Sequence, residues 1–178
     1  MMGVCGTGKT TISLATEKCL NESGLYQAKA IDADDYHPIS NIEKMRNGIP
    51  LTDEDRLDWL LSIHNVIKNY ITNEGNVIIL ACSALKNKYR DLLFYGQNPK
   101  IDLPKDSLKI IVLSGTKELI TDRMSKRTGH FMAASLLASQ LEILELPEGE
   151  NVTILDISPP IDEIARNAVN FITNNTMN

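Results

Sequence analysis

The chain has 178 residues and a net charge of −5, from 18 basic and 23 acidic side chains. This length suits one domain, 1–178, with a substantial core, and the acidic balance argues against a nucleic-acid-binding surface. No apolar run approaches a membrane span, and the three cysteines are isolated, without a C-x-x-C pair. We therefore expect a cytoplasmic protein with neither a nucleic-acid nor a membrane partner.

A phosphate-binding pattern lies at the start of the chain. Residues 3–10 read Gly-Val-Cys-Gly-Thr-Gly-Lys-Thr and fit G-x-x-x-x-G-K-[ST]. In such a loop (the P-loop) backbone N–H groups surround the phosphates, Lys9 reaches the β- and γ-oxygens, and the Thr10 hydroxyl ligates Mg²⁺. We expect ATP and Mg²⁺ here. The expected nucleotide-binding residues of this segment are Gly3, Cys5, Gly6, Thr7, Gly8, Lys9, Thr10 and Thr11.

The segment before the P-loop is unusually short. A P-loop normally follows a buried strand of about five to six residues, but only Met1 and Met2 precede Gly3. We expect a truncated first strand, lying centrally between the strands at 77–81 and 109–113. A shortened product or a late start codon would explain the truncation.

The rest of the chain alternates between helical and strand patterns. After the P-loop the sequence predicts helices at 10–20, 52–71, 85–95, 116–126, 133–145 and 160–173, and strands at 28–32, 77–81, 109–113 and 152–156. Residues 38–50 are rich in turn formers and are expected to form a loop. The alternation predicts an α/β fold with a parallel sheet covered by helices on both faces.

Two carboxylates follow the strand at 28–32, at the edge where ligands bind in such sheets. Asp32 is the candidate metal residue beside Thr10, and Asp34 is the candidate base that accepts the proton of an attacking alcohol. The alternative interpretation is a solvated acidic turn. Two other residues, His64 and Trp59, are expected to serve packing.

Basic residues follow at two further places. Lys86 and Arg90 lie four residues apart on a predicted helix and would offer charge to an anionic substrate, although Arg90 equally suits a surface ion pair. Around 123–132 a Gly interrupts a helical pattern, which predicts a lid. There, Arg123 and Arg127 would stabilise the transferred phosphoryl group; a structural helix–turn–helix corner is the alternative.

Seven sequence blocks follow one another along the chain: the P-loop, Asp-x-Asp-x-x-His-Pro (32–38), Asn-Ile-x-Lys-Met (41–45), Gly-x-Pro-Leu-x-Asp-x-Asp-Arg (48–56), Cys-Ser-Ala-Leu-Lys-x-x-Tyr-Arg-Asp (82–91), Arg-x-Gly-His-Phe-Met (127–132) and Ser-Gln-x-Glu-x-Leu-Glu (139–145). Together these blocks resemble the small P-loop gluconokinases, which are related to shikimate kinases.

The resemblance implies a three-layer P-loop kinase fold with a five-stranded sheet, a lid and often a homodimer. It implies that ATP phosphorylates D-gluconate at its terminal hydroxyl, giving 6-phosphogluconate for the pentose phosphate pathway. The expected catalytic residues are Lys9, Asp34 and Arg127; the expected substrate-binding residues are Asp34, His37, Arg56, Lys86 and His130. A kinase of another small acceptor such as shikimate, or an inactive nucleotide-binding module, are the competing interpretations.

Overall fold

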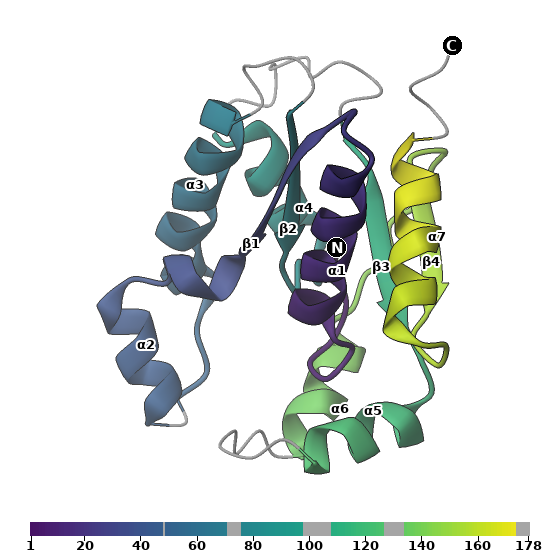
Figure 1. Cartoon of the computed structure of the whole chain (residues 1–178). Helices are drawn as coiled ribbons and strands as arrows, with labels where there is room; N and C mark the ends of the chain where they lie inside the picture. The colour runs from purple at the N-terminus through teal and green to yellow at the C-terminus, as the bar shows by residue number, and fades with distance from the viewer. Residues whose placement is uncertain (48, 71–75, 98–107, 127–133, 174–178) are drawn as a thin grey trace.

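The computed structural model describes residues 1–47, 49–70, 76–97, 108–126 and 134–173. Two pairs of parallel strands form the sheet (Figure 1). β1 (Gln27–Asp32) pairs with β2 (Asn76–Ala81), and β3 (Ile110–Ser114) pairs with β4 (Val152–Asp156). The carboxyl ends of the strands therefore meet at one edge of the sheet, as the sequence predicts.

Met1 and Met2 join the two pairs of strands. The Met1 amine donates to Leu80 O at 2.6 Å and Met1 O accepts from Cys82 N at 3.1 Å. On the other side, Met2 N donates to Ile111 O and Met2 O accepts from Leu113 N, both at 2.8 Å. The first segment thus lies between β2 and β3, where the sequence analysis expects it, and it forms a single parallel bridge with β3.

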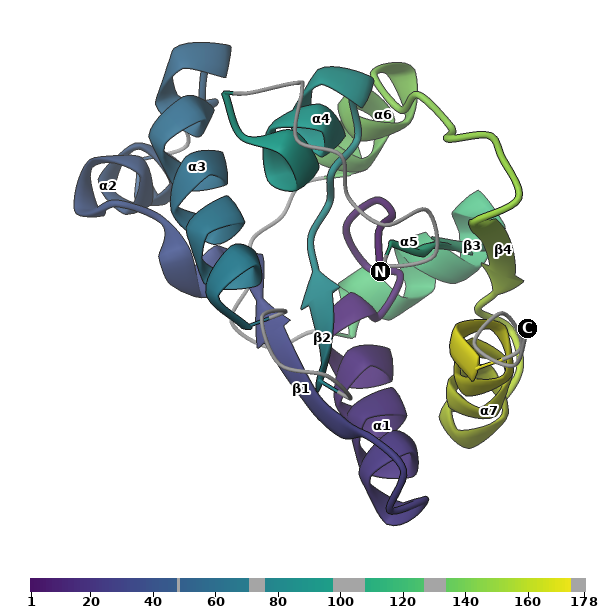
Figure 2. The same cartoon turned by 90° about the horizontal axis from the view of Figure 1, so that it is seen from above.

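Helices cover both faces of the sheet, so the prediction of three layers is confirmed. α1 (Lys9–Glu22) and α7 (Ile161–Thr173) lie on one face, and α3 (Asp53–Tyr70) and α4 (Asn87–Tyr95) lie on the other (Figure 2). Buried apolar side chains fill both interfaces; Ile12 and Ile164 pack on the first face, and Leu60 and Leu93 on the second.

Local signals explain where the helices begin. Thr52 and Asp55 form a capping box at the start of α3, because Thr52 Oγ1 accepts from Asp55 N and Asp55 Oδ2 accepts from Thr52 N. Thr116 Oγ1 accepts from Leu119 N at the start of α5 (Lys117–Ser125). α6 (Ala134–Glu142) follows at the carboxyl edge of the sheet.

The prediction of a loop over 38–50 is wrong in part. α2 (Ile39–Arg46) forms there, preceded by the short 3₁₀ helix η1 (Ala33–Tyr36). Pro38 stands at the N-cap of α2 and does not interrupt it, and Asn41 is buried, donating to Asp55 O at 2.7 Å. This contact between α2 and α3 favours a helix here, even though the segment is rich in turn-forming residues.

No helix in the described ranges is both long and apolar enough to cross a membrane.

Candidate functional site

The P-loop curls through three glycines with positive φ: Gly3 (147°), Gly6 (81°) and Gly8 (87°). At Gly3 a Cβ atom would lie 2.6 Å from Leu113 O, and at Gly6 it would lie 2.7 Å from Met124 Cγ. A side chain at either position would therefore collide with β3 or α5. Gly8 is the N-cap of α1, so the positive end of that helix faces the space enclosed by the loop.

Lys9 lies across the inside of the P-loop. Its Nζ donates to Gly3 O and Val4 O, each at 3.1 Å, and burial lowers the Lys9 pKa from its usual value, an effect that Asp34 opposes. Thr7, which is fully buried, also donates its hydroxyl to Val4 O at 2.9 Å. Two side chains of the motif thus hold the loop in its curled form.

Thr10 and Asp32 form the candidate metal pair at the start of α1 and the end of β1. The Thr10 hydroxyl donates to Asp32 Oδ2 at 2.6 Å, and Asp32 Oδ1 accepts from Asp34 N at 3.0 Å. Oxygen donors of this kind suit Mg²⁺, which binds through one or two carboxylates together with substrate phosphates. The described residues contain no group of three or more His, Cys, Asp or Glu side chains that would hold a metal by themselves.

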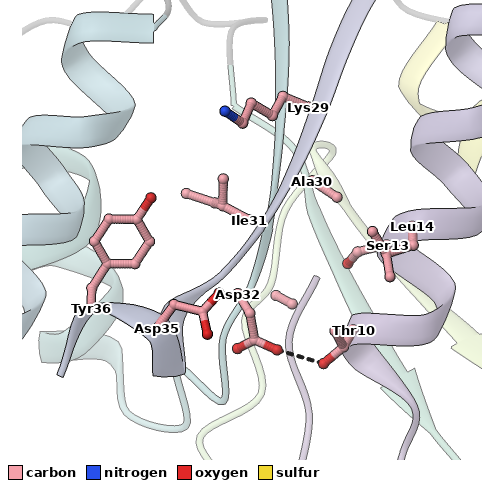
Figure 3. Close-up of a pocket in the computed structure, with 10 residues that line it drawn as sticks. Thr10, Ser13, Leu14, Lys29, Ala30, Ile31, Asp32, Asp35 and Tyr36 are labelled. Carbon is pink, nitrogen blue, oxygen red and sulfur yellow. Dashed lines mark hydrogen bonds between the residues drawn. The ribbon is translucent and has the colours of Figure 1, made fainter.

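A cavity of about 360 Å³ flanks this pair, between α1, β1 and η1 (Figure 3). Ten described residues line it, and Lys9 and Asp34 are not among them: Thr10, Ser13, Leu14, Lys29, Ala30, Ile31, Asp32, Asp35, Tyr36 and Ala81. The cavity therefore lies beside the metal pair, and the candidate base is not part of its wall.

Like its neighbour Asp35, Asp34 is exposed at this edge. Its side chain is 83% exposed, and His37 Nε2 lies 3.9 Å from its Oδ1. Solvent reaches the side chain, but the protein around the carboxyl group still reduces its hydration and raises the pKa of Asp34, and the nearby Asp32 carboxylate raises it further. The charges of Asp34 and Lys9 interact, because Asp34 raises the pKa of Lys9 and Lys9 lowers the pKa of Asp34.

His37 is a packed residue, which the sequence analysis does not anticipate. Its side chain is 5% exposed and its ring stacks on Trp59 with 4.1 Å between ring centroids. Trp59 is itself buried, and its Nε1 donates to Ala33 O at 2.7 Å. Burial lowers the His37 pKa. The contact of His37 with substrate stays a prediction, and the ring lies beside Asp34; the expected packing of Trp59 is confirmed.

A group of cations surrounds the Tyr89 ring. Arg56, Lys86 and Lys88 lie with their charged atoms 5.7, 5.4 and 5.8 Å from its centroid. Asp53 accepts hydrogen bonds from the Tyr89 hydroxyl and Lys88, and Lys86 Nζ lies 3.5 Å from it. The structure thus brings the expected substrate residues Arg56 and Lys86 together. The group has three further members that helix spacing in the sequence does not reveal: Asp53, Tyr89 and Lys88.

Arg90 corrects both interpretations made from the sequence. It is 5% exposed, its Nη1 donates to Ala84 O at 2.8 Å, and its Nη2 donates to Asn87 Oδ1. Ala84 has a positive φ of 44°, so Arg90 holds a bent loop (82–86) and is neither a surface ion pair nor a substrate contact. Likewise, His64 Nδ1 donates to Leu93 O at 3.0 Å, in agreement with its expected packing position.

The candidate lid is described only at its beginning. Arg123, on α5, donates to Ile157 O at 2.7 Å, and its Nη1 lies 3.8 Å from where a Cβ atom at Gly8 would stand. The structure therefore places Arg123 beside the P-loop. Arg127 and His130 lie outside the described residues.

Comparison with known proteins identifies the family to which the chain belongs. Residues 1–93, about half of the chain, match the family model of adenylylsulphate kinase. A probable gluconokinase of Dictyostelium discoideum is 40% identical, over 97% of this chain and 84% of that protein. The thermosensitive gluconokinase of Escherichia coli (strain K12) is 42% identical, over 88% of this chain and 76% of that protein. The chain belongs to the gluconokinase family.

Solved structures agree with this membership. A gluconokinase from Sinorhizobium meliloti superposes with a TM-score of 0.74 and is 37% identical, over 97% of this chain and 89% of that one. The APS kinase CysC of Mycobacterium tuberculosis, at 15% identity and a TM-score of 0.65, shares the fold. The P-loop kinase fold of the gluconokinase family is therefore the fold of this chain.

The His37–Trp59 stack gives a prediction. Replacing His37 with Ala uncovers one face of the only tryptophan, so its fluorescence emission should shift to longer wavelength, and stability should fall by about 0.5–1.5 kcal/mol. His64→Ala, a change away from Trp59, is the control and should leave the emission maximum in place. Unchanged emission in His37→Ala would contradict the stacked arrangement.

Proposed function

We propose that this chain transfers the γ-phosphoryl group of ATP to the terminal hydroxyl of D-gluconate, giving 6-phospho-D-gluconate and ADP. The observation that carries the proposal is the meeting of Lys9, the Thr10–Asp32 pair and Asp34 at one edge of the sheet. Membership of the gluconokinase family supports D-gluconate as the acceptor.

On the donor side, the curled P-loop binds the triphosphate. Its N–H groups and the start of α1 attract the β-phosphate, and Lys9 exchanges its carbonyl partners for phosphate oxygens. Thr10 and Asp32 would hold Mg²⁺, which, when bound, neutralises charge on the phosphates. Arg123, next to Gly8, and Arg127, by resemblance, would stabilise the phosphoryl group in transfer.

On the acceptor side, Asp34 accepts the proton of the attacking hydroxyl, because it is an exposed carboxylate whose charge interacts with that of the P-loop lysine. Stacking on Trp59 holds His37 behind it. Arg56 and Lys86 converge over Tyr89 and would bind the carboxylate at the other end of the acceptor. His130 keeps its expected substrate role by resemblance.

Asp34→Asn tests the assignment of the base. This variant keeps the shape of the side chain but cannot accept a proton, so kcat should fall by about 10²–10⁴-fold while the affinity for ADP stays within about twofold. A coupled assay of ADP release and calorimetry measure the two quantities. Asp58→Asn, at an exposed position of α3, serves as the control; a parental kcat in Asp34→Asn would refute the role of Asp34.

Arg56→Leu tests the acceptor. D-glucitol has the same carbon chain as D-gluconate but no carboxylate, so the parent should favour gluconate in kcat/KM by about 10–100-fold, which is the worth of one charge-assisted hydrogen bond. Arg56→Leu should remove most of this preference, whereas Arg46→Leu, at an exposed position of α2, should retain it. Equal use of shikimate and gluconate by the parent would contradict the proposed substrate.

We also infer that the bonds by which Met1 and Met2 join β2 and β3 are few enough for longer backbone pairing at this place to raise the stability of the fold. Each of the two residues reaches its neighbours through few hydrogen bonds. Furthermore, burial lowers the pKa of the Met1 amine to about 6, so its charged form opposes folding.

An added segment tests this inference. Six apolar residues placed before Met1 would turn the amine into a neutral N–H and pair with β2 and β3, so stability should rise by about 3 kcal/mol, or roughly 6–12 °C in Tm. Six Gly and Ser residues are the control of equal length. An equal Tm for the two extended chains would contradict the inference.

A further inference from the structure

One segment on the carboxyl edge contacts both sides of the site. The α6 strap, defined here as residues 137–145, runs from the middle of α6 into the chain that follows it. Leu137, 1% exposed, packs in the same apolar cluster as Val4 and Cys5 of the P-loop and Leu85 of the 82–86 loop. The strap is therefore anchored in the core beneath both loops.

Gln140 makes a direct bond to the P-loop. Its Oε1 accepts a hydrogen bond from Cys5 N at 2.6 Å, across 135 residues of sequence. Gln140 lies three residues after Leu137, so the two side chains share one face of α6. The neutral amide oxygen satisfies a backbone donor of the P-loop without adding negative charge next to the place where a triphosphate binds.

Glu145 makes the corresponding bonds on the acceptor side. Its N–H donates to Leu85 O at 2.8 Å, and its Oε2 accepts from Asn87 N at 2.5 Å. These two partners stand on either side of Lys86. The Glu145 carboxylate also opposes the lowering of the pKa that burial causes in Arg90, the residue that holds Ala84 O. Glu145 thus supports the 82–86 loop in two ways, through its two hydrogen bonds and through its charge, which faces Arg90.

We propose that Gln140 and Glu145 are positioning residues, which fix the P-loop and the loop that carries Lys86 at a set separation. The inference rests on the proposed function, because the separation sets how the acceptor hydroxyl meets the γ-phosphorus. A displacement of about 1 Å in such an arrangement costs about 10²-fold in rate. Neither residue touches the reacting atoms.

Substitutions at Gln140 and at Glu145 test the contact with the P-loop and the contact with the 82–86 loop one at a time. Gln140→Met removes the acceptor at similar size, so it should raise KM for ATP about tenfold and leave KM for gluconate within twofold. Glu145→Ala should do the reverse, raising KM for gluconate about tenfold with KM for ATP within twofold. Both should lower kcat about 10–100-fold. Glu142→Gln, on the exposed side of α6, is the matched control and should keep all three constants.

Conservative variants refine the test. Gln140→Glu retains an acceptor but adds charge beside the triphosphate, so KM for ATP should rise at least as much as in Gln140→Met. Glu145→Gln keeps an oxygen acceptor for Asn87 N and loses only the charge that faces Arg90, so its KM for gluconate should lie between those of the parent and Glu145→Ala. If Gln140→Met or Glu145→Ala fails to fold, the KM values of these two conservative variants test the proposal in their place.

Binding without turnover distinguishes this inference from the proposed function. Calorimetry of the full chain with ADP should show affinity reduced about tenfold in Gln140→Met and unchanged in Glu145→Ala. That result supports the Gln140 contact even if gluconate proves not to be the acceptor. A lowered Tm with both KM values and ADP affinity unchanged would mean a merely structural role and would overturn the proposal, as would identical kinetic changes in the two variants.

Discussion

The placement of Met1, Met2 and Gly3 between β2 and β3 is the constraint on which the site depends. Met1 O holds Cys82 N at the end of β2, and Met2 bonds to Ile111 and Leu113 of β3. Gly3 then passes Leu113 O so closely that no side chain fits. The P-loop, the 82–86 loop and the end of β3 are therefore fixed relative to one another by a few backbone bonds. Lys9 in the P-loop and Lys86 at the end of the 82–86 loop are positioned from this frame.

The charges of the site are arranged in three parts along the carboxyl edge. Lys9 and the start of α1 provide positive potential for a triphosphate, although the chain as a whole carries −5. Asp32 and Asp34 stand next to them, and their mutual repulsion contributes to the raised pKa of Asp34. Arg56 and Lys86 form a second positive region over Tyr89, with Asp53 as counter-ion. An acceptor that is anionic at one end and has a hydroxyl at the other matches this order.

The sequence predicts what depends on local pattern. The P-loop, the four strands and the pairing of Thr10 with Asp32 follow from spacing and from the rule that parallel strands end at one edge. Contacts between distant segments are not visible in a pattern. The stack of His37 on Trp59, the burial of Arg90 and the bond from Cys5 N to Gln140 each depend on how two helices or loops pack. The sequence analysis does not predict α2 for the same reason, since the Asn41 side chain is held by Asp55 O of α3.

The most direct test of the central claim follows the γ-phosphoryl group itself. The purified chain is given ATP labelled at the γ-phosphorus, Mg²⁺ and D-gluconate, and the products are separated and identified. The account predicts that the label appears in a phosphate ester on the terminal carbon of gluconate, in a one-to-one ratio with ADP, and that Lys9→Ala abolishes it. Label found only as inorganic phosphate, or ATP left intact, would contradict the account.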